Sequence, residues 1–302
     1  WKLTGPHNTV EAAVRHTQGT FDVNNQTCNW GSFYLSGNVG AFTDLTRTLI
    51  LGSSNITLRH STLNLFTFCA EATTNLTVMP NSANVIIAAT NSSRAFRSTG
   101  KDWNGLSVTH LTEGGSPTTF FFAAGGVLKN YTLIGTDTPG TDNILQINNY
   151  GFKVTGTLTL HGYSAGKRLR VFSNGPNGAI QYYTRTIDVT GASINCANVD
   201  FLGVSFISSV TSENPIDLSS ISGGSGEMSY CSNITFTAPA SLYFYAPTTG
   251  TKNWSDSNNW YLGSGGTGGL AGRIPLPQDT AVFDANSFAA ISTIVNTDHP
   301  RL

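Results

Sequence analysis

Short segments in which apolar residues alternate with polar ones recur along this chain, and they constrain its fold more than any other feature. Successive side chains of a strand point to opposite faces of a sheet, so each such segment predicts a short strand with one buried face. Asn, Gly, Ser or Pro stands between most of the segments, as expected of turns. A weak 3.6-residue apolar stripe at Val10 to Val14 allows a turn or two of helix. The alternating segments include Ile56/Leu58, Leu106/Val108, Tyr131/Leu133, Leu158/Leu160, Val199/Phe201 and Leu242/Phe244.

Two all-β architectures fit this pattern. A sandwich needs longer strands joined by hairpins, whereas a solenoid needs short strands repeated about every 20 residues. SSNITLRHSTLNLF (53–66) is echoed by TTNLTVMPNSANVII (73–87), and Ile56 and Leu76 lie 20 positions apart. The echo favours stacked coils, which bury together a core that one coil cannot bury alone. We therefore predict an all-β fold, with a right-handed parallel β-helix over residues 1–246. A small, truncated β module is expected over residues 247–302.

The composition excludes several classes of protein. Charged residues make up only 11% of the 302 residues and the formal net charge is −1, so we expect no binding to nucleic acid or to an anionic membrane. Thr suits a pleated surface and Asn suits turns, and both are abundant. No run of 18 apolar residues occurs, which predicts no membrane insertion. The chain begins at Trp1 without a visible signal peptide, and we interpret it as a segment of a longer chain or a processed product.

Four cysteines, Cys28, Cys69, Cys196 and Cys231, leave two alternatives open. None forms a C-x-x-C pair, which argues against a zinc ribbon or a redox motif. Free cysteines are commonly buried, so all four could be core thiols. In an extracellular protein they could instead form two disulfides. The aromatic run FFF at residues 120–122 is expected in the core or in a subunit contact rather than in a ligand site.

Two tryptophans, Trp254 and Trp260, bracket the polar segment SDSNN near the C-terminus. Asp and Asn side chains bond to backbone N–H groups two residues on, so this segment predicts a turn. The tryptophans would then pack on one another or on the last coil. The glycine run SGGTGG (264–269) is expected to be a flexible loop, and Ala281 and Phe283 of the following strand are expected to point inward.

The same region offers other interpretations. Asp256, Asp279 and Asp284 supply three carboxylates, which could form a calcium site, but their spacing is not that of an EF-hand loop. An exposed tryptophan could instead stack on a sugar. We favour the structural interpretation, in which the aspartates set turns, and we predict no metal-binding residue and no cofactor.

Several segments together resemble a repeat family of phage structural, tail-fibre-like proteins and large bacterial surface proteins. KDWNGLSVTH (101–110), VTGTLTLHG (154–162) and INCANVDFLGVSF (194–206) are similar to its Thr- and Asn-rich rungs, as is HTQGTFDVNNQTCNWGSF (16–33). NWSDSNNW (253–260), with the later PLPQDTAVFD, resembles its W-S-D-x-x-N-W module. The resemblance implies a parallel β-helix in a long fibre or spike. It implies no catalytic residue.

Polysaccharide hydrolysis is the enzymatic alternative, because β-helices often host such enzymes. The reaction needs two carboxylates about 5–9.5 Å apart. The candidates are Asp137 with Asp142, which stand among turn residues, and Asp188 with Asp200 on neighbouring strands. Asp188 lies between Ile187 and Val189 and is expected to face outward. We predict no catalytic residue and no enzyme activity.

The six histidines show no metal-ligand spacing. His110 and His161 each follow a strand-like residue, and we expect both at coil corners.

The function that this sequence predicts is structural: a β-helical segment of a virion fibre, spike or decoration protein, acting in display and host attachment. A bacterial cell-surface adhesin or stalk is the alternative, and a carbohydrate-binding or carbohydrate-cleaving, tailspike-like β-helix is another. We expect an extracellular location, on a virion or a cell surface. The expected partners are further copies of the chain, three if it forms a virion fibre, and a glycan or protein on a host surface.

Overall fold

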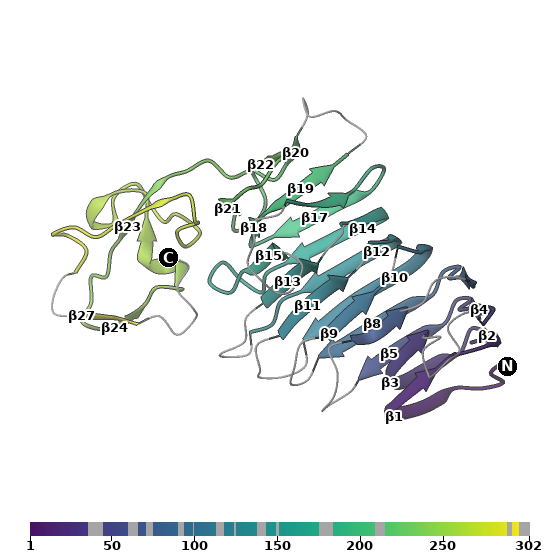
Figure 1. The fold of residues 1–302 in the computed structure, drawn as a ribbon. Coiled ribbons are helices and arrows are strands. Elements are labelled where there is room, and N and C mark those ends of the chain that lie inside the picture. The colour runs from purple at the N-terminus through teal and green to yellow at the C-terminus, as the bar shows by residue number, and fades with distance from the viewer. Residues whose placement is uncertain are drawn as a thin grey trace.

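The computed structural model describes residues 1–35, 45–59, 66–70, 75–89, 94–98, 100–112, 118–123, 125–137, 143–148, 151–174, 184–208, 215–288 and 292–295. These residues form an all-β structure of long parallel sheets (Figure 1), with two single-turn 3₁₀ segments and no α-helix among them. The predicted fold class, all-β, is confirmed.

A helical turn at Val10 to Val14 was the one helix that the sequence allowed, and that expectation is wrong. The residues belong to strand β1 (His7–Arg15), which pairs in parallel with β3 (Thr27–Leu35). The ladder of backbone hydrogen bonds to β3 outweighs the weak local preference for helix.

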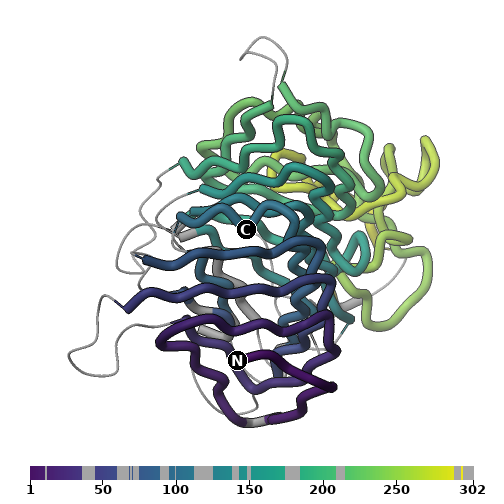
Figure 2. The backbone as a smooth tube through the Cα atoms, turned by 90° about the vertical axis from the view of Figure 1, so that its right-hand side faces the viewer, coloured from purple at the N-terminus to yellow at the C-terminus, as the bar shows by residue number. Residues whose placement is uncertain are grey.

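The strands form successive parallel ladders in which each strand pairs with one well ahead of it in sequence. Figure 2 shows the resulting layers of chain lying one above another. The first ladder runs through β1, β3, β5 (Asn55–Arg59), β8 (Asn84–Ala89), β10 (Asp102–Thr112), β12 (Val127–Ile134), β14 (Phe152–His161) and β17 (Ser193–Ala197).

The second ladder starts from the C-terminal half of β3. It continues through β6 (Phe66–Ala70), β9 (Arg94–Arg97), β11 (Thr118–Ala123), β13 (Asn143–Asn148), β15 (Leu169–Asn174), β18 (Val199–Leu202) and β21 (Ser225–Ser229). Three shorter ladders accompany these two. One consists of β2 (Gly19–Asp22), β4 (Arg47–Ile50) and β7 (Leu76–Met79), and another continues from β14 through β16 (Arg185–Asp188) to β19 (Val204–Ile207). The third pairs β20 (Ile216–Asp217) with β22 (Ile234–Thr235).

The predicted period of about 20 residues holds for β1 and β3, whose partners lie 19 to 21 residues apart, but it is wrong for the echo from which it was inferred. Ile56 pairs with Val85, which lies 29 positions later, and not with Leu76. Leu76 belongs to β7, whose partner is β4. The echo in the sequence compared two strands of one layer, whereas the structure pairs strands of successive layers.

One large apolar core lies between these ladders. It joins side chains of the 17-stranded sheet with those of the β2–β4–β7 sheet, such as Leu49. Phe33, Phe68 and Phe96 occupy register positions of successive strands, and their rings follow one another at centroid distances of 5.5 and 4.8 Å. Stacking of like residues at one register position therefore adds aromatic contacts to the burial of apolar area.

Asparagine at the ends of the strands explains part of the unusual composition. Asn24, Asn25, Asn75, Asn81, Asn198 and Asn233 all have positive φ. Asn adopts this left-handed conformation more readily than other residues with a side chain, because its short amide can bond locally. At Asn25 the amide oxygen accepts from the Ser53 N–H at 2.7 Å. The Asn25 amide thus joins turns of successive layers without adding charge.

A second, smaller apolar cluster lies near the C-terminus. Its buried members are Leu242, Phe244, Ala246, Trp260 and Ile274. It is built on β23 (Ser241–Phe244), which pairs antiparallel with β25 (Trp260–Tyr261) and parallel with β26 (Thr280–Val282). β24 (Gly250–Asn253) and β27 (Ser292–Val295) form a separate pair. We call residues 240–295 the C-terminal module. The domain boundary at residue 246 stays a prediction.

Candidate functional site

The tryptophan turn of the C-terminal module has the predicted local structure. The rings of Trp254 and Trp260 pack edge to face with centroids 4.7 Å apart, and Trp260 is fully buried. Trp260 Nε1 also donates to the carbonyl oxygen of Trp254 at 2.9 Å. Asp256 caps the 3₁₀ turn η2 (Ser257–Asn259) by accepting from the Asn258 N–H at 3.0 Å. The packing of the tryptophans on one another is therefore confirmed.

The other two aspartates of this region serve as turn residues too. Asp284 accepts from the Asn286 N–H at 2.9 Å, and hydrogen bonds from Ser264, Asn286 and Ser287 hold the pKa of its carboxyl below the ordinary value. The side chain of Asp279 is completely buried and pairs with Arg273. Its two oxygens accept from the backbone N–H groups of Ala240 and Leu276 at 2.8 and 2.7 Å.

These bonds bear on the calcium alternative, because each carboxylate already has donors of its own in a different turn. Within the described ranges, no group of three or more His, Cys, Asp or Glu side chains could hold a metal ion. The structure thus does not bring Asp256, Asp279 and Asp284 together as ligands.

Two details of this region differ from expectation. Phe283 was expected to point inward but is 43% exposed, although its ring contacts Phe244 at 5.2 Å. The glycine run expected to be a loop contains the 3₁₀ turn η3 (Ser264–Gly266), and a Cβ at Gly266 would lie 2.6 Å from the ring of Tyr245. The absence of a side chain there lets the aromatic ring approach the backbone.

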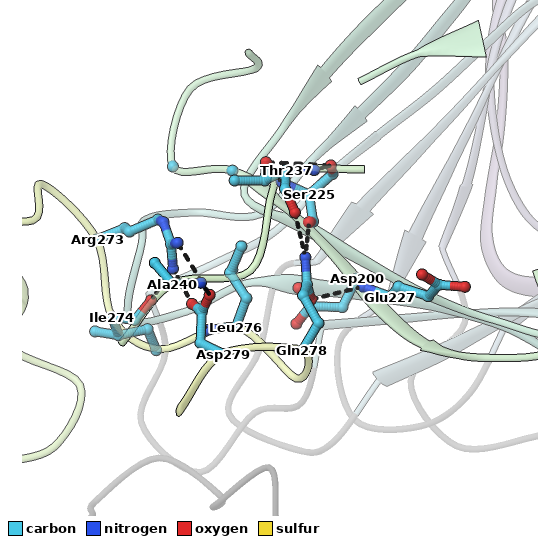
Figure 3. Close-up of polar contacts among 12 residues, drawn as sticks. Asp200, Ser225, Glu227, Thr237, Ala240, Arg273, Ile274, Leu276, Gln278 and Asp279 are labelled. Atoms are coloured by element: carbon cyan, nitrogen blue, oxygen red, sulfur yellow. Dashed lines mark hydrogen bonds and ion pairs between the residues drawn. The ribbon is translucent and has the colours of Figure 1, made fainter. Parts of the chain in front are cut away.

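The C-terminal module docks on the last strand of the second ladder, β21, as Figure 3 shows. The amide of Gln278 reaches the backbone of Ser225 at 2.9 Å and of Glu227 at 3.0 Å. Pro277 lies against Gly226, where a Cβ would come within 2.7 Å of its ring. Gly226 therefore allows close contact between the two parts of the chain.

Beneath this contact lies a fully buried ion pair. Arg168 Nη2 and Asp200 Oδ1 are 2.7 Å apart, and both side chains are inaccessible to solvent. The guanidinium also donates to the carbonyl oxygens of Val199 at 3.0 Å and Gly224 at 2.7 Å, and to that of Gly223. A buried ion pair needs such additional hydrogen bonds to offset its loss of hydration. Arg168 thus ties β18 to the turn before β21.

The carboxylates proposed for hydrolysis are not arranged as a pair. Asp200 is bound to Arg168, whereas Asp188 lies in another ladder and pairs with Lys153 at 3.1 Å. Asp137 is exposed and lies 3.6 Å from Lys167. Asp142 lies outside the described residues.

Asp188 lines a shallow groove of about 270 Å³ with Gly126, Gly151 and Phe152. Partial burial alone would raise the pKa of Asp188, but the hydrogen bonds from Thr190 and Lys153 lower it below the ordinary value. A general acid in glycoside cleavage needs the opposite shift. Asp188 is therefore unsuited to that role.

Cys196 lines an open pocket of about 480 Å³, together with Ile194, Ile216 and Leu218. Burial raises the pKa of its thiol to about 12, so almost none of it is the nucleophilic thiolate at neutral pH. Cys28, Cys196 and Cys231 are free thiols, of which Cys28 and Cys196 are buried. The side chains of Cys69 and of residues 120–122 lie outside the described part of the chain.

The two histidines expected at coil corners have different outcomes. His161 ends β14 and bonds to Asn195 at 2.9 Å on the surface. His110 is wholly buried inside β10, where its Nδ1 lies 2.7 Å from the hydroxyl oxygen of Tyr131. The expectation for His110 is wrong because this residue continues the alternation that points Leu106 and Val108 into the core.

His110 should make stability depend on pH. Burial lowers its pKa from 6.5 to about 3, so on acidification the unfolded chain binds the proton first. The contribution of His110 is complete above pH 6.5 and is lost as the pH falls towards 3, by up to about 1.4 kcal/mol per pH unit. Urea titrations between pH 7 and 5 should show this slope, and it should decrease in His110→Gln. His161→Gln, which alters an exposed imidazole, is the control, and equal slopes in wild type and His110→Gln would contradict the prediction.

The sequence did not point to Arg168 or Gln278. At the junction, where the C-terminal module meets the ladders, each of these side chains makes hydrogen bonds to several backbone groups. Arg168 precedes the alternating apolar pair Leu169/Val171, so the pattern predicts an exposed side chain. For Gln278 the sequence indicates only that the residue lies in a turn, because Pro277 and Asp279 on either side of it favour turns.

The described residues include no helix that is both long and apolar enough to cross a membrane. Comparison with family models, with curated proteins and with solved structures found no match to this chain.

Proposed function

We propose that this chain is a right-handed parallel β-helical segment of a virion fibre, spike or decoration protein, acting in display and host attachment. The observation that carries the proposal is the unbroken succession of parallel pairings from β1 to β17. A chain stacked in this way is long in one direction and contacts mainly its neighbouring layers, which suits a rod that holds other parts at a distance.

The chemistry of the described side chains agrees with a passive role. The acids weighed for hydrolysis have cationic partners at Asp137, Asp188 and Asp200. The resemblance of NWSDSNNW (253–260) to a module of phage and surface proteins adds a second line of support. We propose three copies of the chain in the fibre, and a glycan or protein of the host surface as the partner.

Immuno-electron microscopy tests the proposal. Antibodies raised against the purified chain should place gold on fibres or spikes of virions from the source of the sequence. Antibodies absorbed beforehand with the purified chain serve as the control. Gold on cell surfaces in the absence of virions would contradict the virion proposal and favour a bacterial adhesin or stalk.

A polysaccharide assay tests the enzymatic alternative. We expect no release of reducing ends when the purified chain is incubated with host glycans. Release that is abolished by Asp188→Asn or Asp137→Asn, but not by Asp256→Asn, would contradict the structural role and indicate a tailspike-like depolymerase.

A further inference from the structure

The outer edge of β21 is the place where the second ladder stops. In a parallel ladder the N–H and C=O of one residue point to the same side, and those of the next residue point to the other side. The backbone groups of Ser225 and Glu227 bond to Thr237 and Gln278, so these two residues face away from β18, and Gly226 between them faces it. These groups are where a further parallel strand would bond. An edge of this kind is a template for pairing with another chain unless it is covered.

Side chains of the same chain cover this edge. Gln278 Nε2 donates to the carbonyl oxygen of Ser225 at 2.9 Å, and Gln278 Oε1 accepts from the N–H of Glu227 at 3.0 Å. One residue of a parallel neighbour would make the same two bonds through its own N–H and C=O. The side-chain amide of Gln278 thus takes the position of a peptide group (Figure 3). Thr237 completes the cover, since its hydroxyl oxygen accepts from the Ser225 N–H at 2.9 Å.

A rigid turn holds Gln278 in this position. The Asp279 N–H donates to the Leu276 carbonyl oxygen at 2.9 Å, and the Asp279 carboxylate accepts from the Leu276 N–H at 2.7 Å. Pro277 fixes φ within the same turn. Arg273 pairs with Asp279 from the side of the C-terminal module. Gln278 is thereby presented to β21 by a turn that belongs to another part of the chain.

We propose that the C-terminal module terminates the parallel sheet. The amide of Gln278 replaces the backbone of a next strand and prevents β21 from pairing with a strand of a second copy of this chain. The contact is intramolecular and includes the hydrogen bonds of Gln278 and the packing of Pro277 on Gly226, so displacement of the module opens the edge.

Hydrogen exchange measures the cover directly. In Gln278→Met the side chain keeps its approximate size but neither donates nor accepts, and we expect exchange at the Glu227 amide to rise about tenfold. Exchange at Thr57 and Leu58 in β5 should not change. Gln26→Met is the matched control, because the side-chain amide of Gln26 donates within its own turn, to the Asn24 carbonyl oxygen at 2.9 Å. Wild-type exchange at Glu227 in Gln278→Met would overturn the proposal.

A second variant leaves Gln278 intact and displaces the module. A Cβ at Gly166 would lie 2.3 Å from the carbonyl oxygen of Ser255, so Gly166→Ala should push the module away from the ladders. Exchange at Glu227 should rise in this variant too. In sedimentation velocity, both variants should show a species of twice the wild-type mass that grows with concentration. Faster exchange without this species would overturn the claim that Gln278 prevents pairing with a second copy.

Discussion

Replacing Arg168 with methionine is expected to lower the free energy of unfolding by about 3–5 kcal/mol. The substitution leaves the Asp200 carboxylate buried without its cationic partner, and the carbonyl oxygens of Gly223, Gly224 and Val199 lose a donor. Urea denaturation, followed by the fluorescence of the buried tryptophans, measures the change.

Lys167→Met is the matched control, because it removes the neighbouring cation, whose partner Asp137 is exposed. Because the Asp137 carboxylate is exposed to solvent, we expect this pair to contribute about 0–1 kcal/mol. Adding Asp200→Asn to Arg168→Met should recover part of the loss, since it removes the uncompensated charge. A loss below about 1 kcal/mol in Arg168→Met, or no recovery in the double variant, would show that the pair does not stabilise the junction.

Trp260→Ala should unfold the C-terminal module and leave the parallel ladders folded. Trp260 is fully buried and packs edge to face on Trp254 at 4.7 Å and on Phe244 at 5.2 Å. Truncating such a side chain costs about 3–5 kcal/mol, which a cluster of five buried residues cannot absorb. Because layered structures contact mainly their neighbours, the damage should remain local. Limited proteolysis should leave a resistant fragment that ends near residue 240.

Trp1→Ala provides the control for this experiment, because the Trp1 side chain is 93% exposed. Its digestion pattern should match that of the wild type. Degradation of the entire Trp260→Ala chain at one rate would mean that the module and the ladders unfold together. Trp254→Ala should have a smaller effect than Trp260→Ala, since Trp254 is only partly buried.

The strands could be predicted from the sequence because the alternation of apolar residues directly reports the period of a half-buried strand. The pairing of the strands could not. NITLR at residues 55–59 resembles NLTVM at 75–79, yet β5 pairs with β8. Short strands rich in Thr and apolar residues fit many partners equally well, so the register depends on the whole stack rather than on local similarity.

The turns of the C-terminal module could also be predicted, because Asp256 and Asp284 bond within two residues of themselves. The junction was beyond prediction. Asp200 lies between Val199 and Phe201, so the alternation alone would place it on the solvent face. It is buried only because Arg168 and Pro277 cover that face from distant parts of the sequence. Contacts between residues so far apart in the sequence produce no local sequence pattern.

The distances between partners in the first ladder have a consequence for how such a chain can evolve. Successive register partners, from Ala13 and Ser32 to Leu158 and Ile194, are separated by as few as 19 and as many as 36 residues. Register shifts of one or two residues occur within the β1–β3, β10–β12 and β12–β14 pairs, and the rest of the variation in length lies between the strands. Insertions and deletions at the corners therefore need not displace the core, so selection can tolerate them. The outer surface can then diversify while the ladders are inherited unchanged.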